Sequence, residues 1–312
     1  MAINTIALAE KMTSVLDKAV VQKAVTGFLA DNAMGAKFVG AKTVLIPEIN
    51  MNGLGNYDRD TGYVQGALTV SSTAYTLGID RGRKFQLDAQ DADESGVANL
   101  AGQVMGEFIR TKVVPEIDAY NLSKLAKYAK DNNQTVSGTL IATTTTASEP
   151  YKIFTNAVLK AQDALSYDEE LVAFVNTEFW AALNNSNEFT RQITVSNFRQ
   201  GDVNLQVKSI NGISLIPVAS DRMKTVITLL DGESSNQTAG GFAPASGAEN
   251  VGLLVLPRKA AMFVKKTEPT RIFQPSQNQN ADSWVFTYRI YYDLFIRNTL
   301  KKGIYAYTYS AS

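Results

Sequence analysis

Two groups of carboxylates are the residues of this sequence whose types and spacing suit acid–base chemistry. Paired carboxylates act as general acid and base in glycoside hydrolysis, so a hydrolase is one alternative for this chain. The sequence of 312 residues contains no cysteine and no histidine, and it therefore lacks thiol nucleophiles, imidazole bases and the commonest zinc ligands. The two groups are Glu116 with Asp118, and the acidic run Asp88, Asp91, Asp93 and Glu94.

Both groups have a structural explanation that we favour over catalysis. Glu116 and Asp118 lie close together in a predicted helix at a spacing that points their side chains in different directions. The acidic run precedes the same helix, where Asp91 and Glu94 supply caps for the first amides and negative charge for the helix dipole. We therefore expect no enzyme active site.

A further pair of acidic residues, Asp58 and Asp60, has the spacing of a calcium-binding loop. The glycine at position 62 is misplaced for that motif, and no glutamate closes the loop. The glycine-rich residues 231–250 likewise lack the glycine fingerprints of nucleotide-binding loops. We expect neither a metal ion nor another cofactor.

The element that carries Glu116 and Asp118 is one long predicted helix, residues 97 to about 130. Its apolar residues recur every three or four positions and form one stripe, which needs a partner surface. Pro115 lacks an amide hydrogen and should kink the helix. The stripe begins with Val97, Leu100, Ala101, Val104, Met105 and Phe108.

A long hairpin is predicted before this helix. Residues 42–49 and 64–77 have the pattern and the β-branched or aromatic residues of strands. Their connection, residues 52–62, is rich in glycine, asparagine and aspartate and holds charges of both signs, which indicates an exposed tip. Residues 6–29 predict an amphipathic helix, either an arm that reaches another subunit or a segment that docks internally.

An inserted α/β subdomain is predicted after the long helix. The polar residues 131–148 mark its boundary, and predicted helices and strands follow. Residues 231–250 predict a mobile exposed loop. The helices are predicted at 149–165 and 177–183, and the strands at 171–175, 203–207, 213–218, 225–230 and 251–256.

Two long strands, residues 261–273 and 283–297, are predicted to return to the long helix, and a short strand at 304–309 ends the chain. Apolar residues alternate in the second long strand, so one face should cover the helical stripe at Val104, Met105 and Phe108. Core packing is favoured over a platform that stacks nucleic-acid bases. The aromatic residues concerned are Trp284, Tyr288, Tyr291 and Tyr292.

Several short motifs, together with this order of elements, carry a resemblance that covers nearly the whole chain. They lie in the predicted hairpin tip, the segment after it, the long helix and the second returning strand. The sequence resembles the major capsid proteins of tailed bacteriophages, which have the Hong Kong 97 phage fold. The motifs are Gly53-Leu54-Gly55-Asn56-Tyr57-Asp58-Arg59, Thr61-Gly62-Tyr63, Asp80-Arg81-Gly82-Arg83, Met105-Gly106-Glu107-Phe108, Val114-Pro115-Glu116-Ile117-Asp118-Ala119-Tyr120 and Tyr292-Asp293-Leu294-Phe295.

The resemblance implies an α+β fold and a structural function. The chain would be a shell subunit that assembles into pentamers and hexamers, forming an icosahedral phage head around double-stranded DNA. It would be located in the virion and assembled in the host bacterial cytoplasm. The implied parts are an N-terminal arm at 1–39, an extended E-loop hairpin at 40–78, a first P-domain part with the spine helix at 79–130, an A-domain at 131–256 and P-domain return strands at 257–312.

The implied partners are further copies of the chain, a separate scaffolding protein and a portal. A separate scaffolding protein is expected because no long coiled extension precedes the arm. The resemblance implies that DNA inside the shell is contacted only non-specifically. Lysine plus arginine and aspartate plus glutamate number 30 each, so the chain itself should neutralise little of the phosphate charge. No apolar run approaches the length of a membrane helix, and we expect no membrane partner.

The hairpin tip is the predicted site of inter-subunit contact, because tyrosine and arginine are favoured at the centres of interfaces. An encapsulin-type compartment shell is the alternative within the same fold, and the hairpin motif favours the phage branch. The predicted contact residues are Tyr57, Asp58, Arg59, Asp60 and Tyr63.

Overall fold

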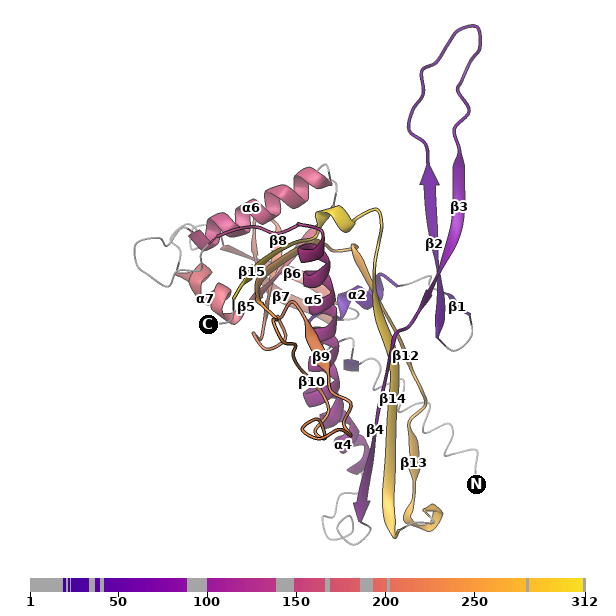
Figure 1. The fold of residues 1–312 in the computed structure, drawn as a ribbon, viewed down its shortest axis with the longest axis vertical. Helices are drawn as coiled ribbons and strands as arrows, with labels where there is room; N and C mark the ends of the chain where they lie inside the picture. The colour runs from indigo at the N-terminus through magenta and orange to yellow at the C-terminus, as the bar shows by residue number, and fades with distance from the viewer. Residues whose placement is uncertain are drawn as a thin grey trace.

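The computed structural model is a mixed α+β structure with one long hairpin that projects from its body (Figure 1). None of the helices among the described residues is long and apolar enough to cross a membrane. The residues that the structure describes are 19–20, 22, 24–33, 37–39, 42–88, 100–138, 149–165, 169–185, 193–200, 203–278 and 281–310.

The long helix is present and is continuous through three segments: α4 (Leu100–Phe108), a π-helical turn η1 (Ile109–Val113) and α5 (Val114–Asp131). Within η1 the backbone N–H of Val114 donates to the carbonyl oxygen of Ile109, five residues back. The next residue, Pro115, has no N–H to donate, so the helix absorbs the proline by widening this turn. The residues predicted to start and cap the helix, including Asp91, Asp93 and Glu94, lie outside the described residues.

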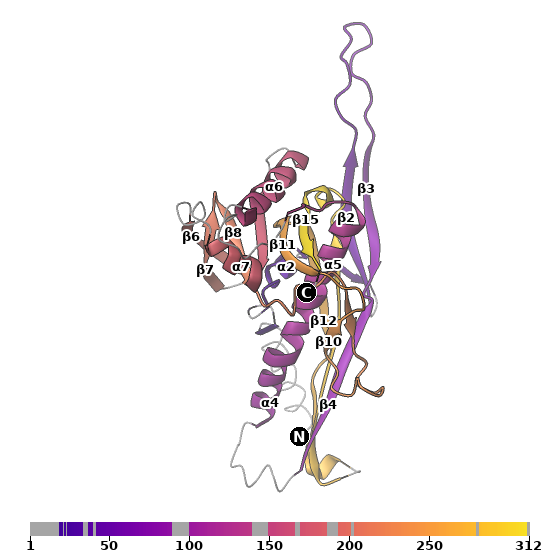
Figure 2. The same ribbon diagram turned by 60° about the vertical axis from the view of Figure 1, so that its left-hand side comes forward.

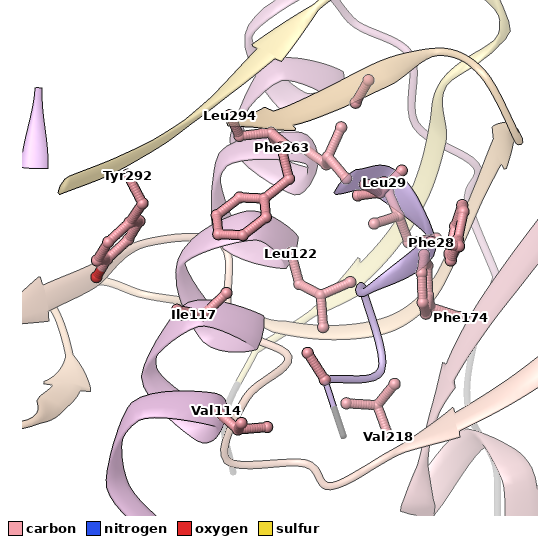
Figure 3. Close-up of a cluster of buried hydrophobic side chains, with 14 of the residues drawn as sticks. Phe28, Leu29, Val114, Ile117, Leu122, Phe174, Val218, Phe263, Tyr292 and Leu294 are labelled. Carbon is pink, nitrogen blue, oxygen red and sulfur yellow. The ribbon is translucent and has the colours of Figure 1, made fainter. Parts of the chain in front are cut away.

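The apolar stripe of the long helix meets the second returning strand, as predicted. Strand β14 (Ser283–Ile296) contributes alternate residues to the core cluster that also holds the buried residues of α5. Met105 is fully buried in that cluster, and the half-buried ring of Phe108 lies 5.8 Å from the ring of Tyr288. The alternate residues of β14 in this cluster are Phe286, Tyr288, Ile290, Tyr292 and Leu294, some of which are drawn in Figure 3.

Strand β14 is paired along both edges. Strand β4 (Ile79–Asp88) pairs antiparallel with residues 283–292 of β14. Strands β12 (Ala261–Thr267) and β13 (Arg271–Phe273) pair with its other edge. The sequence analysis did not predict β4, because its residues 80–84 are mostly charged and include a glycine, which is unfavourable for a strand when long-range pairing is not known.

The α/β subdomain is a six-stranded sheet in the order β15-β11-β5-β8-β7-β6. Helix α5 covers one of its faces, and α6 and α7 cover the other (Figure 2). The pattern of β5 reflects this, since Val172 and Phe174 join the α5 cluster whereas Ala173 and Val175 join the α6 and α7 cluster. The elements are α6 (Glu149–Ala164), α7 (Thr177–Asn184), β5 (Leu171–Asn176), β6 (Ile193–Gln200), β7 (Val203–Ile210), β8 (Ile213–Val218), β11 (Asn250–Pro257) and β15 (Tyr305–Tyr309).

Strand β15 is the short last strand predicted at residues 304–309, and Ile304 and Ala306 join the core cluster of the long helix. It pairs antiparallel with β11, inside the six-stranded sheet, and not with the returning strands β12 and β14. The end of the chain therefore packs with the inserted subdomain, and Tyr307 is buried between α7 and the sheet with its ring 5.8 Å from that of Phe179. The division of the chain into domains stays a prediction.

Residues 231–250 contain a strand where the sequence predicted only a loop. Strand β10 (Phe242–Pro244) pairs antiparallel with β9 (Ile227–Leu229). Arg81 of β4 donates to the carbonyl oxygens of Leu230 and Gly241, at 2.6 and 3.1 Å. The prediction of a free loop missed these contacts, because the backbone of this segment is held by a side chain far away in the sequence.

The described part of the N-terminal segment docks on the body of the same chain. Helix α2 (Phe28–Asp31) buries Phe28 and Leu29, and the ring of Phe28 stacks on that of Phe174 in β5 (Figure 3). Internal docking is thus the alternative that holds for residues 24–33. Residues 1–18, where most of the predicted arm helix falls, lie outside the described residues. Strand β1 (Lys37–Val39) then leads into the hairpin.

Candidate inter-subunit contact site

The carboxylates of Glu116 and Asp118, one of the two groups considered for catalysis, bind different partners. The carboxylate of Glu116 accepts from Nε and Nη2 of Arg81, at 3.0 and 2.9 Å, and from the hydroxyl of Tyr292 at 3.0 Å. The Asp118 carboxylate faces the N-terminal segment and accepts from the backbone N–H and the hydroxyl of Thr26, at 2.9 and 2.8 Å. The two residues fasten different elements to the long helix.

Asp118 has the environment of a structural carboxyl group. It is fully buried, and burial raises its pKa, against the opposing effect of hydrogen bonds from Thr26 and Val25 and of the charge of Arg222. Asp88 lies exposed at the end of β4, and no cluster of three or more acidic residues suited to a metal ion occurs in the part of the chain that the structure describes.

The predicted contact residues lie together at the end of the projecting hairpin. The hairpin consists of β2 (Thr43–Met51) and β3 (Leu68–Thr76), which pair antiparallel over their full length. Its far end extends well beyond the body (Figure 1). We call residues 57–63 the tip. All of the predicted residues, Tyr57, Asp58, Arg59, Asp60 and Tyr63, are exposed there.

The tip is a tight turn that Asp58 organises. Its backbone exchanges hydrogen bonds with Gly62, and its Oδ1 accepts from the backbone N–H of Asp60 at 2.7 Å and of Thr61 at 3.0 Å. Gly62 has φ of +79°, a conformation that side chains disfavour, which explains a glycine at this position. The amides of Thr61 and Asp60 lower the pKa of Asp58, so it is an anion at neutral pH.

Two tyrosines and two further charges surround this turn. The rings of Tyr57 and Tyr63 lie 4.9 Å apart between centroids, yet 61% and 89% of these residues remain exposed. One carboxylate oxygen of Asp58 accepts hydrogen bonds from backbone amides of the turn. This is the usual role of an aspartate in a turn and not that of a calcium ligand. The tip therefore offers aromatic surface and two carboxylates to solvent.

The strands beneath the tip carry a second exposed surface that the sequence analysis missed. Met51 and Leu68 are opposite each other in the register, and Val70 lies on the same face two residues further along β3. These three residues, which we call the ribbon face, are between 66% and 72% exposed. The opposite face of β3 carries Thr69 and Ser71. The alternation of residues 68–71 was the available signal.

The base of the same hairpin is buried. Val44, Ile46 and Leu77 form a small cluster with Tyr291 and Phe295 of β14. Their burial ties the first few residues of β2 and the end of β3 to the body. The hairpin is thus anchored to the body at one end. At the other end it carries the exposed ribbon face and the exposed tip.

A polar contact to the long helix secures this base. Oδ2 of the buried Asp293 accepts the backbone N–H of Gly78 at 3.1 Å. Its Oδ1 accepts the hydroxyl of Tyr120 at 2.7 Å and the ammonium of Lys124. The direction in which the hairpin leaves the body is therefore fixed against α5 by one carboxylate.

Sequence comparisons alone identify no relatives: no family model matches the chain, and no curated protein sequence matches it significantly. Solved structures do match. A chain from the capsid of the cyanophage P-SCSP1u superimposes with a TM-score of 0.53 at 10% identity, covering 88% of this chain and 86% of that chain.

Two further solved structures give the same result. A chain from the mature capsid of bacteriophage PhiM1 superimposes with a TM-score of 0.52 at 11% identity, over 86% of this chain and 82% of that chain. A chain of the Gordonia phage Cozz gives 0.50 at 10% identity, over 86% and 81%. At these identities the likeness concerns the fold, and the chain has the fold found in bacteriophage capsid structures.

Proposed function

We propose that this chain is the major capsid protein of a tailed bacteriophage, a structural subunit that assembles with copies of itself into a closed shell. The fold likeness supports the proposal, since the matching chains come from phage capsids. In this proposal the fold is of the Hong Kong 97 type. Residues 1–39 are the N-terminal arm, 40–78 the E-loop, 79–130 and 257–312 the P-domain, and 131–256 the A-domain.

The observation that carries the proposal is the exposed ribbon face. Met51, Leu68 and Val70 form a contiguous apolar surface on a slender element, and the described residues of the chain leave it uncovered. Exposed apolar patches of this kind mark sites of protein association. In a shell each copy would receive the hairpin of a neighbour. Symmetry would then bury the exposed apolar face of every copy against another copy.

The proposal includes partners and a location. Pentamers and hexamers of the chain would form an icosahedral shell in the virion, assembled in the host bacterial cytoplasm with a separate scaffolding protein and a portal. The wall would touch double-stranded DNA without reading its sequence, and with equal numbers of acidic and basic residues the chain would neutralise little of the phosphate charge. The role is structural, and the separate engagements of Glu116 and Asp118 favour it over that of a carboxylate hydrolase.

The test is assembly of the expressed chain, alone and with the products of neighbouring genes, followed by sedimentation and negative-stain microscopy. We expect capsomer rings or closed shells from the unaltered protein. Changing Arg59→Ser and Asp60→Ser should leave the melting temperature unchanged and abolish closed shells, because both side chains are exposed at the tip. Asp58 is kept, since it holds the turn.

The outcome of the tip variant separates two claims. If the unaltered chain and the variant form shells at equal yield, the tip is not a contact site, and the proposed function remains intact. If the unaltered chain stays monomeric even with the products of neighbouring genes, the proposed function itself is rejected.

A further inference from the structure

The chain contains two Asn-Gly pairs, Asn52-Gly53 and Asn211-Gly212, and the structure holds them in different ways. An asparagine followed by glycine can lose its side-chain amide without an enzyme, because glycine has no side chain to shield its backbone nitrogen. The reaction needs a backbone that can bring this nitrogen to the side-chain carbonyl carbon of the asparagine. The local structure therefore decides which of the two pairs reacts.

The pair Asn211-Gly212 forms the tight turn between β7 and β8. Both residues have a positive φ, +50° and +80°, as in the two-residue turns that Asn-Gly favours in β-hairpins. The flanking residues Ile210 and Ile213 pair with each other and are buried. The nitrogen of Gly212 can reach the side chain of Asn211 only if this turn changes its conformation, and the buried pairing opposes that change.

The pair Asn52-Gly53 lies in the projecting hairpin, directly beyond the end of β2 (Figure 1). Both residues are exposed, and the side chain of Asn52 has no hydrogen-bond partner among the described residues. The backbone N–H of Asn52 donates to the carbonyl oxygen of Ala67 at 3.2 Å, and the next backbone hydrogen bond towards the tip is that of Asp58. A Cβ at Gly53 would meet no atom within 4 Å. This backbone is therefore free to adopt the reactive conformation.

We propose that Asn52 is a site of spontaneous deamidation in the unassembled chain, and that the product withdraws the chain from assembly. The backbone nitrogen of Gly53 attacks Cγ of Asn52 and loses its proton, and the side-chain nitrogen leaves as ammonia. A succinimide ring results. Water then opens the ring at one of its two carbonyl carbons and gives aspartate or isoaspartate. In isoaspartate the chain continues through the former side-chain carbonyl, and the former backbone carbonyl becomes a carboxylate.

The effect on assembly rests on the proposed function, because it concerns the hairpin as a contact element. Isoaspartate at position 52 lengthens the backbone by one carbon between Met51 of the ribbon face and the tip. It also places a negative charge beside an apolar surface, and burial of an unpaired charge is unfavourable. Burial of the ribbon face in a shell would restrain the adjacent Asn52. The modification should therefore accumulate mainly in free subunits.

Timed incubation of the dispersed subunit in mildly alkaline buffer tests the site, because base removes the proton from the attacking nitrogen. Digestion and mass spectrometry measure the acid form at each asparagine, and an isoaspartyl methyltransferase labels the rearranged product. Asn52 should react about ten-fold faster than Asn211 in the folded subunit, and at a similar rate in urea, where the turn is lost. Equal rates in the folded subunit, or a faster reaction at Asn211, would overturn the proposed site.

Gly53→Ala is the matched control. Gly53 does not have a positive φ, and its added Cβ would lie in open space, so the variant should fold unchanged. The methyl group shields the attacking nitrogen and should slow deamidation of Asn52 about ten-fold.

Sedimentation after the incubation tests the effect on assembly. The unaltered chain should lose shell yield in proportion to the modified fraction, whereas Gly53→Ala should keep its yield. Normal shells built from chains that are modified at Asn52 would overturn the effect on assembly and leave the proposed function in place. If fresh unaltered chains form no shells, the proposed function is rejected together with this effect, and the mass measurement alone decides whether Asn52 is the reactive site.

Discussion

Two long antiparallel strand pairs, β2 with β3 and β4 with β14, use similar alternating sequences in opposite ways. In β14 the alternate apolar residues Phe286 and Ile290 are buried against the long helix. In the hairpin the alternate residues Leu68 and Val70 are two-thirds exposed. Alternation thus identifies a strand and its apolar face, but not the surface that covers that face. For β14 the cover is in the same chain; for the hairpin we propose that it is another subunit.

The difference predicts that equivalent changes in the two pairs affect different properties. A residue in the β4–β14 pair should contribute to the free energy of unfolding of the single chain. A residue on the ribbon face should contribute to association, because its burial would occur only on assembly. Substitutions in each pair can break or sharpen this distinction.

The largest effect should come from Phe286→Ala. The side chain is 2% exposed and packs in the cluster shared with α5, so the change removes buried surface and leaves a cavity. The free energy of unfolding should fall by about 3 to 5 kcal/mol. Urea unfolding of the dispersed subunit measures it. A loss below about 1 kcal/mol would mean that the β14 face is not the core of this chain.

Asp293→Ala should have the next largest effect, since Asp293 links β14, Gly78 and the long helix. Removing this buried acceptor breaks its hydrogen bonds from the Gly78 N–H and the Tyr120 hydroxyl. The free energy of unfolding should fall by about 2 to 3 kcal/mol. Asp293→Asn retains an acceptor and serves as the matched control. Thermal melting distinguishes the two variants, and equal melting temperatures would remove Asp293 from the account of how the hairpin base is held.

A smaller, pH-dependent effect is expected at the hairpin base. Hydrogen bonds from Arg289, with a lesser contribution from Lys42, lower the pKa of Asp80 below its unfolded value. The folded state therefore favours the ionised group, and this stabilisation is present above about pH 4 and is lost as the pH falls through the folded pKa. Asp80→Asn should lower the melting temperature at pH 7 and have less effect at pH 3. An effect that grows on acidification would contradict this assignment.

Local pattern predicted most of the elements whose structure depends on neighbours in sequence. The long helix followed from the spacing of residues such as Met105 and Phe108, and the tip from its glycine and aspartate content. The elements that were missed depend on distant partners. Strand β4 is charged in its middle and is stabilised by pairing with β14, and β10 is held beside β9 by Arg81.

The candidate site was predicted in part for the same reason. Tyr57 and Asp60 were placed at an exposed turn, because turn chemistry is local. The ribbon face was not predicted, since a hydrophobic residue such as Val70 in an alternating strand is normally buried. Only the three-dimensional arrangement shows that this part of β3 projects beyond the body and has no cover among the described residues.

The central claim, that the ribbon face serves association and not folding, is tested most directly by Met51→Ser with Leu68→Ser and Val70→Ser. The control, Thr69→Asn with Ser71→Asn, changes the opposite face of the same strand. We predict that the free energy of unfolding of the triple variant stays within about 1 kcal/mol of that of the unaltered subunit. The triple variant should yield no closed shells by sedimentation, whereas the control should assemble. Normal shells from the triple variant, or unfolding of its dispersed subunit, would contradict the claim.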